Sequence, residues 1–372
     1  MNFLYLSEED MIKAGVKDMP RCIDAMEETF KLLHRGDYRL GGPKNCDHGL
    51  RTMFPKESDI PNMPIAAPGR WFTAMPAYLG GKYHVFGIKT YGANQENYKK
   101  NLPRSILMMS LMDVETGAPL AYMSANILSA MRTGGVTGLF ARKFAPENAK
   151  KVAVIGPGVI GRYSLDAVMV VCPSIRELSV LGRGEKNKAA FRKHCEDAGY
   201  RFDSYTECDC AADACRDADI VITASSQAQK FCDYPLLPAE SIKRGACVIV
   251  TSAARVERAL LDDPGMDCVL VADDVRSYAD NRGIDALPET DEDRKSVTVK
   301  GAIHERLAAG AAVVDLPDIA DDPNWKREAG KTYLCASGGN PLEDVAWACS
   351  CYERALDLSV GTSLELWKES EL

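Results

Sequence analysis

The chain has 372 residues, of which 46% are hydrophobic and 26% charged, and its formal net charge is −8 at pH 7. This composition is ordinary for a packed globular protein, and the acidic balance excludes an extended basic surface for nucleic acid. No apolar run reaches the roughly 18 residues that cross a bilayer, and residues 1–10 lack the basic start and apolar core of a secretion signal. At roughly 150 residues per domain, we predict a two-domain cytoplasmic protein that acts on small molecules, with no nucleic-acid or membrane partner.

The thirteen cysteines are scattered along the chain, and the only close pairs are Cys208/Cys210 and Cys349/Cys351. Neither pair has the spacing of a zinc knuckle or of a thioredoxin-type motif. The five histidines do not cluster with the cysteines. We therefore predict free and mostly buried thiols, which behave as small apolar side chains, and no metal site.

The first part of the chain combines helices with a run of strands. Residues 20–35 place apolar side chains at helical spacing, namely Ile23, Met26, Phe30 and Leu33. Residues 51–122 consist of short apolar runs broken by Gly, Pro and Asn, which predicts a mostly antiparallel sheet with a turn at 113–119. The helical pattern then returns over 125–144.

In the second part, strands alternate with helices. The expected strands are the segments KVAVIG, ELSVLG, ADIVITAS, ACVIVTS and DCVLVAD. One expected helix begins at residue 159, and a second spans residues 186–198. Interleaved strands and helices predict right-handed βαβ units and a parallel sheet. Residues 299–312 and 343–358 are predicted to form further helices.

The predicted fold class is α/β, with a Rossmann doubly wound parallel sheet plus an α+β domain. We expect the α+β domain to span residues 1–130 and the Rossmann domain to span 131–329. Residues 330–372 are expected to return to the first domain. The charged segment 285–312 is an insertion to which the pattern assigns no role.

A glycine-rich turn follows the strand at 151–155 directly and opens a helix. Gly156 permits the tight turn, Gly158 lets the backbone approach a pyrophosphate, and Gly161 lets the helix pack close to the strand. The helix N-terminus adds unpaired N–H groups and a partial positive charge. This context predicts dinucleotide binding, with a purely structural turn as the alternative, and the expected binding residues are Gly156, Gly158, Val159, Ile160 and Gly161.

The end of the second strand indicates which dinucleotide binds. An NAD-selective site usually has Asp or Glu there, which binds the ribose hydroxyls, but this chain reads Gly-Arg-Gly-Glu-Lys from residue 182. A guanidinium fits a 2′-phosphate because it is always charged and presents a fork of donors. We predict a preference for NADP(H) through Arg183 and Lys186. In the alternative, these two cations are solvated residues that open a helix, Glu185 reaches the ribose, and NAD(H) binds.

Three hydroxyl or imidazole side chains are weaker candidates. Thr223 and Ser225 end the strand at 220–222 and are predicted to contact the nicotinamide ribose; the alternative is that their hydroxyls cap the next segment. His48 lies three residues before Arg51 and is either an assisting acid or an exposed loop residue.

Six segments, in order, resemble the ornithine cyclodeaminase/μ-crystallin family over about residues 45–275, with a weaker similarity near 343–355. They are GLRT from Gly49, MPAY from Met75, GIK from Gly87, residues 113–120, AMRT from Ala130 and the glycine turn. The resemblance implies an N-terminal substrate and dimerisation domain joined to a Rossmann domain, and therefore a homodimer.

The same resemblance implies that Arg51, Lys89 and Arg132 bind the carboxylate of an amino or imino acid. Arginine can hold both carboxylate oxygens at once, which suits this role, whereas the alternative is that each cation lies in an ordinary surface ion pair. Lys89 has a second interpretation because it follows the apolar run 85–88. Burial there would lower its pKa and make it a catalytic proton donor, and the sequence does not choose between clamp and acid.

One position departs from the family pattern. Cyclodeaminating members carry an aspartate after the strand that here spans 247–251, and the matching position is Ala254. An alanine cannot move a proton, so ornithine cyclisation is disfavoured unless Glu257 substitutes. Hydride transfer at a C–N bond needs no carboxylate there if water or Lys89 carries the proton. The glycine region at 337–340 also differs from the family.

These observations leave three functions open. The first is an NAD(P)H-dependent oxidoreductase, an amino acid dehydrogenase or imine/ketimine reductase that acts on the C–N bond of a small carboxylate-bearing substrate. The second is an ornithine cyclodeaminase-type ammonia lyase that uses bound NAD(P). The third is a noncatalytic nicotinamide-binding subunit. The alanine at position 254 favours the first.

Overall fold

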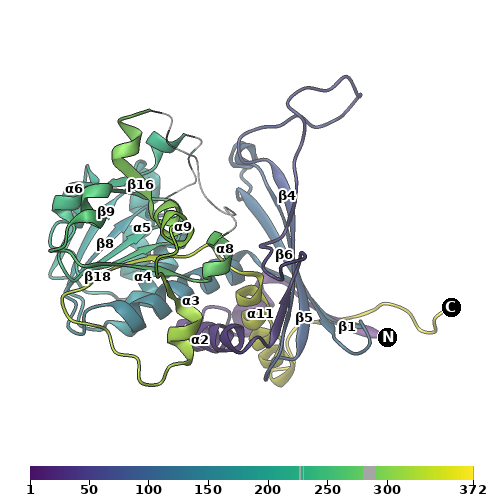
Figure 1. The fold of residues 1–372 in the computed structure, drawn as a ribbon. Helices are drawn as coiled ribbons and strands as arrows, with labels where there is room; N and C mark the ends of the chain where they lie inside the picture. Colours follow the sequence, from purple (N-terminus) through teal and green to yellow (C-terminus); the bar gives the residue numbers. More distant parts are fainter. Residues whose placement is uncertain (226–227, 229, 280–287, 289, 372) are drawn as a thin grey trace. The chain divides into compact units, whose positions relative to one another are not determined.

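The structure is a computed structural model, and it describes residues 1–372 except 226–227, 229, 280–287, 289 and 372. Part of the insertion 285–312 therefore lies outside the described residues. The chain divides into two compact units, each of which is described by itself (Figure 1). Unit 1 consists of Met1–Asp18, Leu32–Arg132 and Asn340–Leu372, and unit 2 of Met19–Lys31 and Thr133–Gly339.

Unit 1 is built on an eight-stranded sheet in the order β19-β1-β7-β6-β5-β4-β2, and β3 also pairs with β4. The pairs from β2 to β7 are antiparallel, as predicted for residues 51–122, while β1 pairs with β7 in parallel. The strands are β1 (Asn2–Leu6), β2 (Tyr38–Leu40), β3 (Leu50–Thr52), β4 (Trp71–Leu79), β5 (Val85–Ala93), β6 (Ser105–Asp113), β7 (Pro119–Ser124) and β19 (Thr362–Glu365).

A buried helix, α11 (Pro341–Asp357), covers one face of this sheet, and it confirms the helix predicted at 343–358. Val85, Gly87 and Lys89 of β5 point to that face because side chains alternate along a strand. A Cβ at Gly87 would lie 2.6 Å from Met109 Cε and 3.0 Å from Val345 Cγ2. Glycine at this position therefore lets the helix approach the strand closely.

Helices complete unit 1 and continue into unit 2. The predicted helices at 20–35 and 125–144 are confirmed as α2 (Met19–Arg35) and α3 (Asn126–Phe144). The unit boundaries fall within both helices, at 31/32 and 132/133. The short α1 (Glu8–Lys13) and the 3₁₀ helix η1 (Gln95–Lys100) lie wholly in unit 1.

Unit 2 contains an eight-stranded parallel sheet in the order β10-β9-β8-β11-β13-β18-β15-β17. Its central strands are buried on both faces, which explains their continuous apolar sequences. The predicted α/β fold class with a Rossmann sheet is therefore confirmed. The strands are β8 (Lys151–Ile155), β9 (Glu177–Leu181), β10 (Ser204–Cys208), β11 (Ile220–Thr223), β13 (Cys247–Val250), β15 (Cys268–Ala272), β17 (Val314–Asp315) and β18 (Thr332–Ala336).

Helices and a small second sheet complete unit 2. The helix predicted at 299–312 ends earlier, at Ala308, and the three-stranded sheet β12-β14-β16 was not predicted. These elements are α4 (Val159–Val171), α5 (Glu185–Asp197), α6 (Ala211–Cys215), α7 (Arg258–Asp262), α8 (Val275–Ala279), α9 (Val299–Ala308), α10 (Leu316–Asp321), β12 (Leu236–Leu237), β14 (Arg255–Glu257), β16 (Ser296–Thr298), and the 3₁₀ helices η2 (Phe231–Asp233), η3 (Ala239–Ser241) and η4 (Asp293–Lys295).

The boundary at which the chain returns from unit 2 to unit 1 differs from the predicted one. The sequence prediction grouped residues 330–372 with the first domain. In the structure, β18 pairs with β13 and β15 in unit 2, and unit 1 resumes only at Asn340. Strand β18 is fully buried in the middle of a parallel sheet, and its sequence Thr-Tyr-Leu-Cys-Ala is only five residues long, so the pattern did not identify it as a strand.

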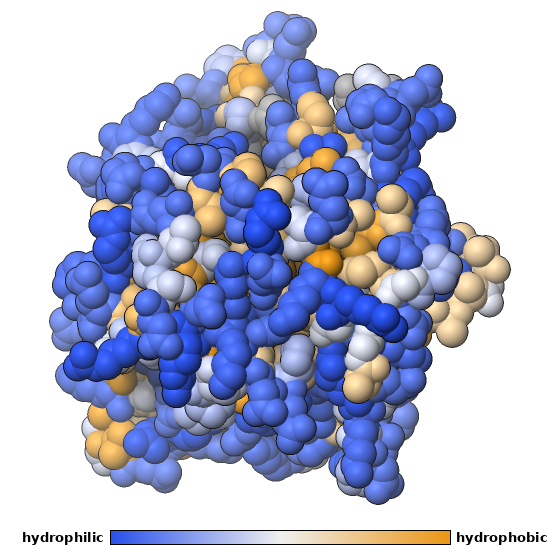
Figure 2. Space-filling view, turned by 90° about the vertical axis from the view of Figure 1, so that its left-hand side faces the viewer, coloured by the Kyte–Doolittle hydropathy of each residue, from blue (hydrophilic) through white to orange (hydrophobic). Residues whose placement is uncertain are grey.

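Several bulk properties can be compared with the structure. All thirteen cysteines are free and nine of them are buried, as predicted. In the part of the chain that the structure describes, no helix is sufficiently long and apolar to span a membrane. The same residues contain no group of three or more His, Cys, Asp or Glu side chains arranged to hold a metal ion. The face drawn in Figure 2 is mainly hydrophilic, with small groups of hydrophobic residues between the polar ones.

Candidate functional site

The glycine turn after β8 has the geometry that each glycine was predicted to supply. Gly156 has a φ of +98°, and a Cβ there would lie 2.6 Å from the backbone of Ala224. A Cβ at Gly161 would collide with the carbonyl oxygen of Gly156, so helix α4 can begin this close to the strand only without a side chain. A Cβ at Gly158 would meet no atom within 4 Å. Open space at Gly158 beside two crowded glycines leaves room for a ligand to approach the backbone.

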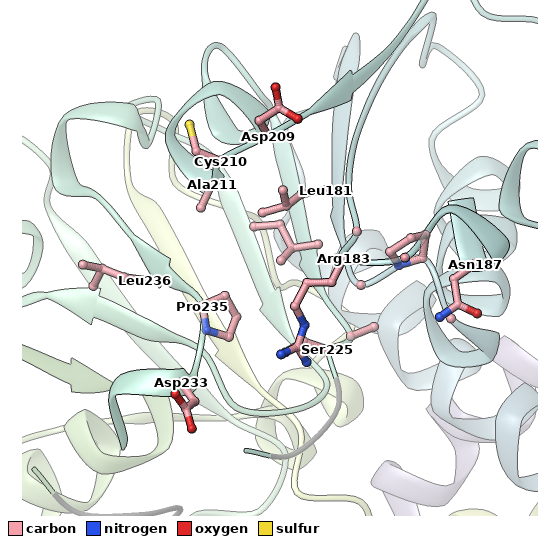
Figure 3. A pocket seen from close by; sticks show the side chains of 17 residues that line it. Leu181, Arg183, Asn187, Asp209, Cys210, Ala211, Ser225, Asp233, Pro235 and Leu236 are labelled. Carbon is pink, nitrogen blue, oxygen red and sulfur yellow. The ribbon is translucent and has the colours of Figure 1, made fainter. Parts of the chain in front are cut away.

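A cavity of about 470 Å³ adjoins this turn, at the carboxyl ends of the parallel strands. Figure 3 shows the side chain of Arg183 extending into the cavity from the loop after β9, with Asn187 on one side and Pro235 and Leu236 on the other. Ser225 also lines the cavity, and its buried hydroxyl oxygen has no hydrogen-bond partner in the described structure. A dinucleotide fits this arrangement, because the open glycine backbone, the guanidinium and the unpartnered hydroxyl are the groups that phosphates and ribose bind.

Not every predicted cofactor residue lies at the cavity. Gly156, Gly158, Arg183 and Ser225 line it, whereas Lys186, Val159, Ile160, Gly161 and Thr223 do not. Thr223 is fully buried, and its carbonyl oxygen accepts hydrogen bonds from the backbone and hydroxyl of Thr251. That the backbone amides at the α4 N-terminus and the buried hydroxyl of Thr223 contact the dinucleotide therefore stays a prediction. A structure with bound ligand would test it.

Sequence reasoning missed one wall of the cavity. Asp209 and Cys210 line it from the loop between β10 and α6, and Ala211 lines it from the start of α6. Their strand, β10, reads Ser-Tyr-Thr-Glu-Cys and has no continuous apolar run, so the periodicity gave no strand signal there. The topology was the available clue, because the next parallel strand of a Rossmann sheet also ends at the nucleotide.

In unit 1, Lys89 belongs to a cluster of four buried charged side chains. Its ammonium nitrogen lies 2.5 Å from Asp344 Oδ2 and 3.4 Å from the hydroxyl of Ser129. Arg132 on α3 donates from Nε to Asp344 Oδ1 at 3.0 Å and from a terminal nitrogen to Glu343 at 2.5 Å. Lys89 is 2% exposed and both carboxylates are fully buried. The structure therefore brings Lys89 and Arg132 together, and it holds them with two acids that were not predicted as site residues.

The two acids occupy the first turn of α11, where the sequence carries a capping box. Asn340 is the N-cap and accepts from the backbone N–H of Leu342, while Glu343 accepts from the backbone N–H of Asn340. Carboxylates are favoured at this end of a helix by its dipole. Two adjacent acids directly before the apolar run 345–349 were the sequence signal for a buried ionic site, because charges are rarely buried without partners.

Burial and ion pairing shift the pKa of Lys89 in opposite directions. Loss of solvent lowers the pKa of Lys89 most strongly, Asp344 raises it, Arg132 lowers it further, and the result is a pKa of about 8. A lysine with this pKa is partly deprotonated just above neutral pH and can exchange a proton with a substrate.

Arg132 keeps its charge in the same surroundings. Burial opposes the charged form, but Asp344 and Glu343 together outweigh burial and hold the pKa of Arg132 above its usual value. Its second terminal nitrogen makes no hydrogen bond to the residues that the structure describes. That N–H group remains available to a carboxylate ligand.

Arg51 lies apart from this cluster on the same sheet. It is exposed on β3, and its guanidinium lies over the indole ring of Trp71, 4.7 Å from the ring centroid. His48 is also exposed, as its loop interpretation requires. The three predicted carboxylate-binding residues therefore form one buried pair and one separate exposed cation.

The position matched to the catalytic aspartate of cyclodeaminases is occupied by a core residue. Ala254 is fully buried in the hydrophobic core of unit 2. Glu257, the substitute weighed from the sequence, accepts a hydrogen bond from the backbone N–H of Ala239 at 2.8 Å. Its carboxylate stabilises the start of a 3₁₀ turn, and Glu257 is not among the described residues that line the cavity.

Comparison with known proteins decides the family. The model of the ornithine cyclodeaminase/mu-crystallin family matches residues 15–359. This chain belongs to that family. The family member N-((2S)-2-amino-2-carboxyethyl)-L-glutamate dehydrogenase of Staphylococcus aureus is 25% identical over 98% of both chains. The alanine dehydrogenase of Archaeoglobus fulgidus is 26% identical over 99% of this chain and 100% of its own.

A solved structure supports the same fold. The Delta(1)-pyrroline-2-carboxylate reductase of Thermococcus litoralis, solved with NADH and L-proline, superposes with a TM-score of 0.74 at 23% identity. The match covers 97% of this chain and 99% of the reductase. The family match over residues 15–359 confirms the resemblance inferred from six sequence segments and extends it over nearly the whole chain.

The charge cluster generates a stability prediction. Asp344→Asn removes the carboxylate shared by Lys89 and Arg132 and leaves two buried cations facing one acid. Breaking a buried ion pair in this way costs about 3–5 kcal/mol. We expect the urea midpoint at pH 7 to fall accordingly. Asp357→Asn, at the exposed end of the same helix, is the matched control and should change the free energy of unfolding by less than about 0.5 kcal/mol. Equal effects of the two substitutions would contradict the assigned role of Asp344.

Proposed function

We propose that the protein is an NAD(P)H-dependent oxidoreductase, an amino acid dehydrogenase or imine reductase that acts on the C–N bond of a small carboxylate-bearing substrate. The observation that carries the proposal is the open glycine turn beside the cavity at Arg183 and Ser225, in a chain whose full-length relatives are dehydrogenases. Both named relatives act on substrates that contain an amino group and a carboxylate, as their names state.

Each unit contributes one part of the proposed machinery. In unit 2, Gly156, Gly158, Arg183 and Ser225 would hold the dinucleotide, which when bound supplies or accepts the hydride. In unit 1, Lys89 and Arg132 would bind the substrate carboxylate through their remaining N–H groups, with Arg51 adding positive charge from the same sheet. The acids Asp344 and Glu343 fix the orientation of these donors, and such positioning is the main contribution that a protein makes to hydride chemistry.

Lys89 would also hold the proton that the reaction needs. Reduction of an imine adds a proton to nitrogen, and the reverse reaction removes one. A buried lysine with a pKa of about 8 can do both near neutral pH. The carboxylate of Asp344, 2.5 Å away, stabilises the protonated form and orients it.

A second candidate function is the cyclodeaminase reaction that names the family. It requires a group that handles the protons of the substrate amine. Ala254 supplies none, and the carboxylate of Glu257 is engaged by the backbone of Ala239. This observation favours net oxidation or reduction over cyclisation.

The reaction itself is the primary test. Purified protein with NADPH or NADH and a panel of cyclic imines, and with the oxidised cofactors and a panel of amino acids, should change the absorbance of the reduced nicotinamide in proportion to substrate. Ammonia release from ornithine or lysine without net redox change would establish the cyclodeaminase instead. Cofactor binding by calorimetry without turnover of any panel member would favour the noncatalytic nicotinamide-binding subunit.

We propose that NADP(H) is preferred over NAD(H) because Arg183 extends into the cavity and no acidic residue ends β9. Arg183→Ala should weaken NADPH binding by about tenfold or more and NADH binding by less than twofold, since a charge-assisted hydrogen bond to the 2′-phosphate is lost. Lys186→Ala changes a neighbouring cation that does not line the cavity, and it should have a smaller effect. Calorimetry with both cofactors measures this difference, and tighter binding of NADH by the unchanged protein would refute the preference.

The proton role of Lys89 predicts a pH profile. Imine reduction needs the protonated lysine, so kcat/KM should fall tenfold per pH unit above about pH 8. Lys89→Met should lose this alkaline limb, and Asp344→Asn should move it to lower pH because Asp344 raises the pKa of Lys89. Lys82→Met, an exposed lysine beside the same sheet, is the control. If Lys89→Met raises KM but keeps the same pH dependence of kcat/KM, Lys89 binds the substrate carboxylate and does not transfer the proton.

We also propose that two copies associate through unit 1, as the family resemblance implies. The sheet face opposite α11 exposes Leu50 (78%), Phe72 (57%), Ile106 (47%) and Tyr122 (36%). Strand register places these side chains on one face, and exposed apolar groups of this kind mark interfaces. Sedimentation of the unchanged protein should give a mass of two chains. Phe72→Glu should reduce this mass to that of one chain.

A further inference from the structure

Three hydroxyl groups at the carboxyl ends of β11 and β13 have no hydrogen-bond partner. The hydroxyl oxygens of Thr223, Ser225 and Ser252 are buried and make no hydrogen bond within the described structure. Thr223 is the last residue of β11, Ser225 follows two residues later, and Ser252 lies two residues after the end of β13. A buried polar group without a partner costs free energy and is normally satisfied by protein, water or a ligand. Thr223 and Ser225 are already predicted to contact the nicotinamide ribose, whereas Ser252 has no role so far.

The neighbouring Thr251 shows how a hydroxyl in this turn is satisfied internally. Thr251 donates from its hydroxyl to the carbonyl oxygen of Thr223 at 2.8 Å, and its backbone N–H donates to the same oxygen at 3.0 Å. These bonds continue the β11–β13 ladder one residue past the strands. Ser252 comes next, and it is partly exposed as a residue although its hydroxyl oxygen is buried. Rotation about one side-chain bond can therefore present this hydroxyl to a ligand at the sheet edge.

Strand register places Ser252 one strand beyond Ser225. Thr223 lies opposite Ile155 of β8 on one side and opposite Val250 of β13 on the other. Two residues further along, Ser225 and Ser252 stand at the same level of neighbouring strands. Neighbouring strands are about 4.8 Å apart. The carboxyl edge of the sheet therefore carries the glycine turn, Ser225 and Ser252 in a row at roughly that spacing.

The cavity indicates the direction in which a dinucleotide would run along this row. The sheet order is β10-β9-β8-β11-β13, and the glycine turn follows β8 in the middle. Arg183 and Asp209 line the cavity from the ends of β9 and β10 (Figure 3). Because Arg183 is proposed to bind the 2′-phosphate, the adenosine half lies over β9 and β10. With the pyrophosphate at the glycine turn, the nicotinamide half then extends over β11 and β13.

Each of these two strand ends meets one part of the nicotinamide half. The ribose is attached next to the pyrophosphate and reaches β11, where Thr223 and Ser225 are predicted to contact it. The nicotinamide ring is one group further out and reaches β13. The carboxamide of that ring has N–H donors and a carbonyl acceptor, and a serine hydroxyl can pair with either. The unpartnered hydroxyl of Ser252 therefore has a matching group in the ligand.

We propose that the hydroxyl of Ser252 binds the carboxamide of the nicotinamide ring and thereby positions the ring for hydride transfer. This inference rests on the proposed function, because it assumes that a nicotinamide dinucleotide binds at the glycine turn. Without such a contact, the ring can rotate about the bond that joins it to the ribose. A hydrogen bond at the carboxamide fixes this rotation, and with it the face of the ring that gives or takes the hydride. Ser252 is thus a positioning residue for the proposed reaction.

Cofactor analogues test the contact by binding alone. Calorimetry compares NADP⁺ or NAD⁺, whichever binds more tightly, with its 3-acetylpyridine analogue, which lacks the amide N–H donors. A second comparison uses the thionicotinamide analogue, in which sulfur replaces the carbonyl oxygen. We expect the unchanged protein to bind the natural cofactor about fivefold more tightly than at least one analogue, because one hydrogen bond is lost or weakened. Ser252→Ala should bring this ratio close to one, and Ser252→Thr, which keeps a hydroxyl, should retain part of the preference.

Thr251→Val is the matched control. It removes the neighbouring hydroxyl, which already has a partner, and should leave the affinity ratio unchanged even if the protein becomes less stable. Ser252→Ala removes a hydroxyl without a partner, so the urea midpoint of the cofactor-free protein should not fall. A merely structural role of Ser252 would give the opposite result, a lower midpoint with an unchanged affinity ratio.

The outcomes separate this inference from the proposed function. A ratio near one for both analogues in the unchanged protein, or a ratio that Ser252→Ala does not alter, overturns the contact with the carboxamide. Cofactor-dependent turnover of an amino acid would then still support the oxidoreductase. If no dinucleotide binds to the folded protein, the proposed function and this inference fall together. Circular dichroism of each variant verifies that the fold is retained.

Discussion

The carboxylate of Asp344 is the interaction on which the substrate side of this protein depends. It joins Lys89 on β5 to Arg132 on α3, two residues that lie 255 and 212 positions away from it in the chain. Without this acid, burial of two cations on one sheet face would be prohibitive, because neither could recover its lost hydration. With it, and with Glu343, the four charges cancel and the cations keep N–H groups to spare. The cluster is at once a structural link between α11 and the sheet and a set of oriented donors.

The same cluster explains how a lysine becomes suitable for proton transfer. Burial lowers the pKa of Lys89, and the neighbouring carboxylate of Asp344 raises it. The two effects together bring it to about 8. Arg51 and Arg104, neither of which pairs with an acid among the described residues, lie over the ring of Trp71.

The predicted dinucleotide site depends instead on positions that carry no side chain. Gly156 and Gly161 are required by the backbone atoms around them, while Gly158 faces open space beside the cavity. At the position that the family resemblance matches to the cyclodeaminase aspartate, Ala254 is buried in the core of unit 2.

The sequence by itself determined the parts that depend on local pattern. The glycine turn, the parallel strands around it, the antiparallel sheet of residues 51–122 and helices α2, α3 and α11 all follow from periodicity and turn chemistry, and the family motifs pointed to Lys89 and Arg132. Tertiary structure decided what depends on long-range pairing. It placed β18 in the Rossmann sheet, separated Arg51 from the other two cations, and set Asp344 against Lys89. No local pattern encodes these results, because each depends on residues that are distant in the chain and meet only in the folded protein.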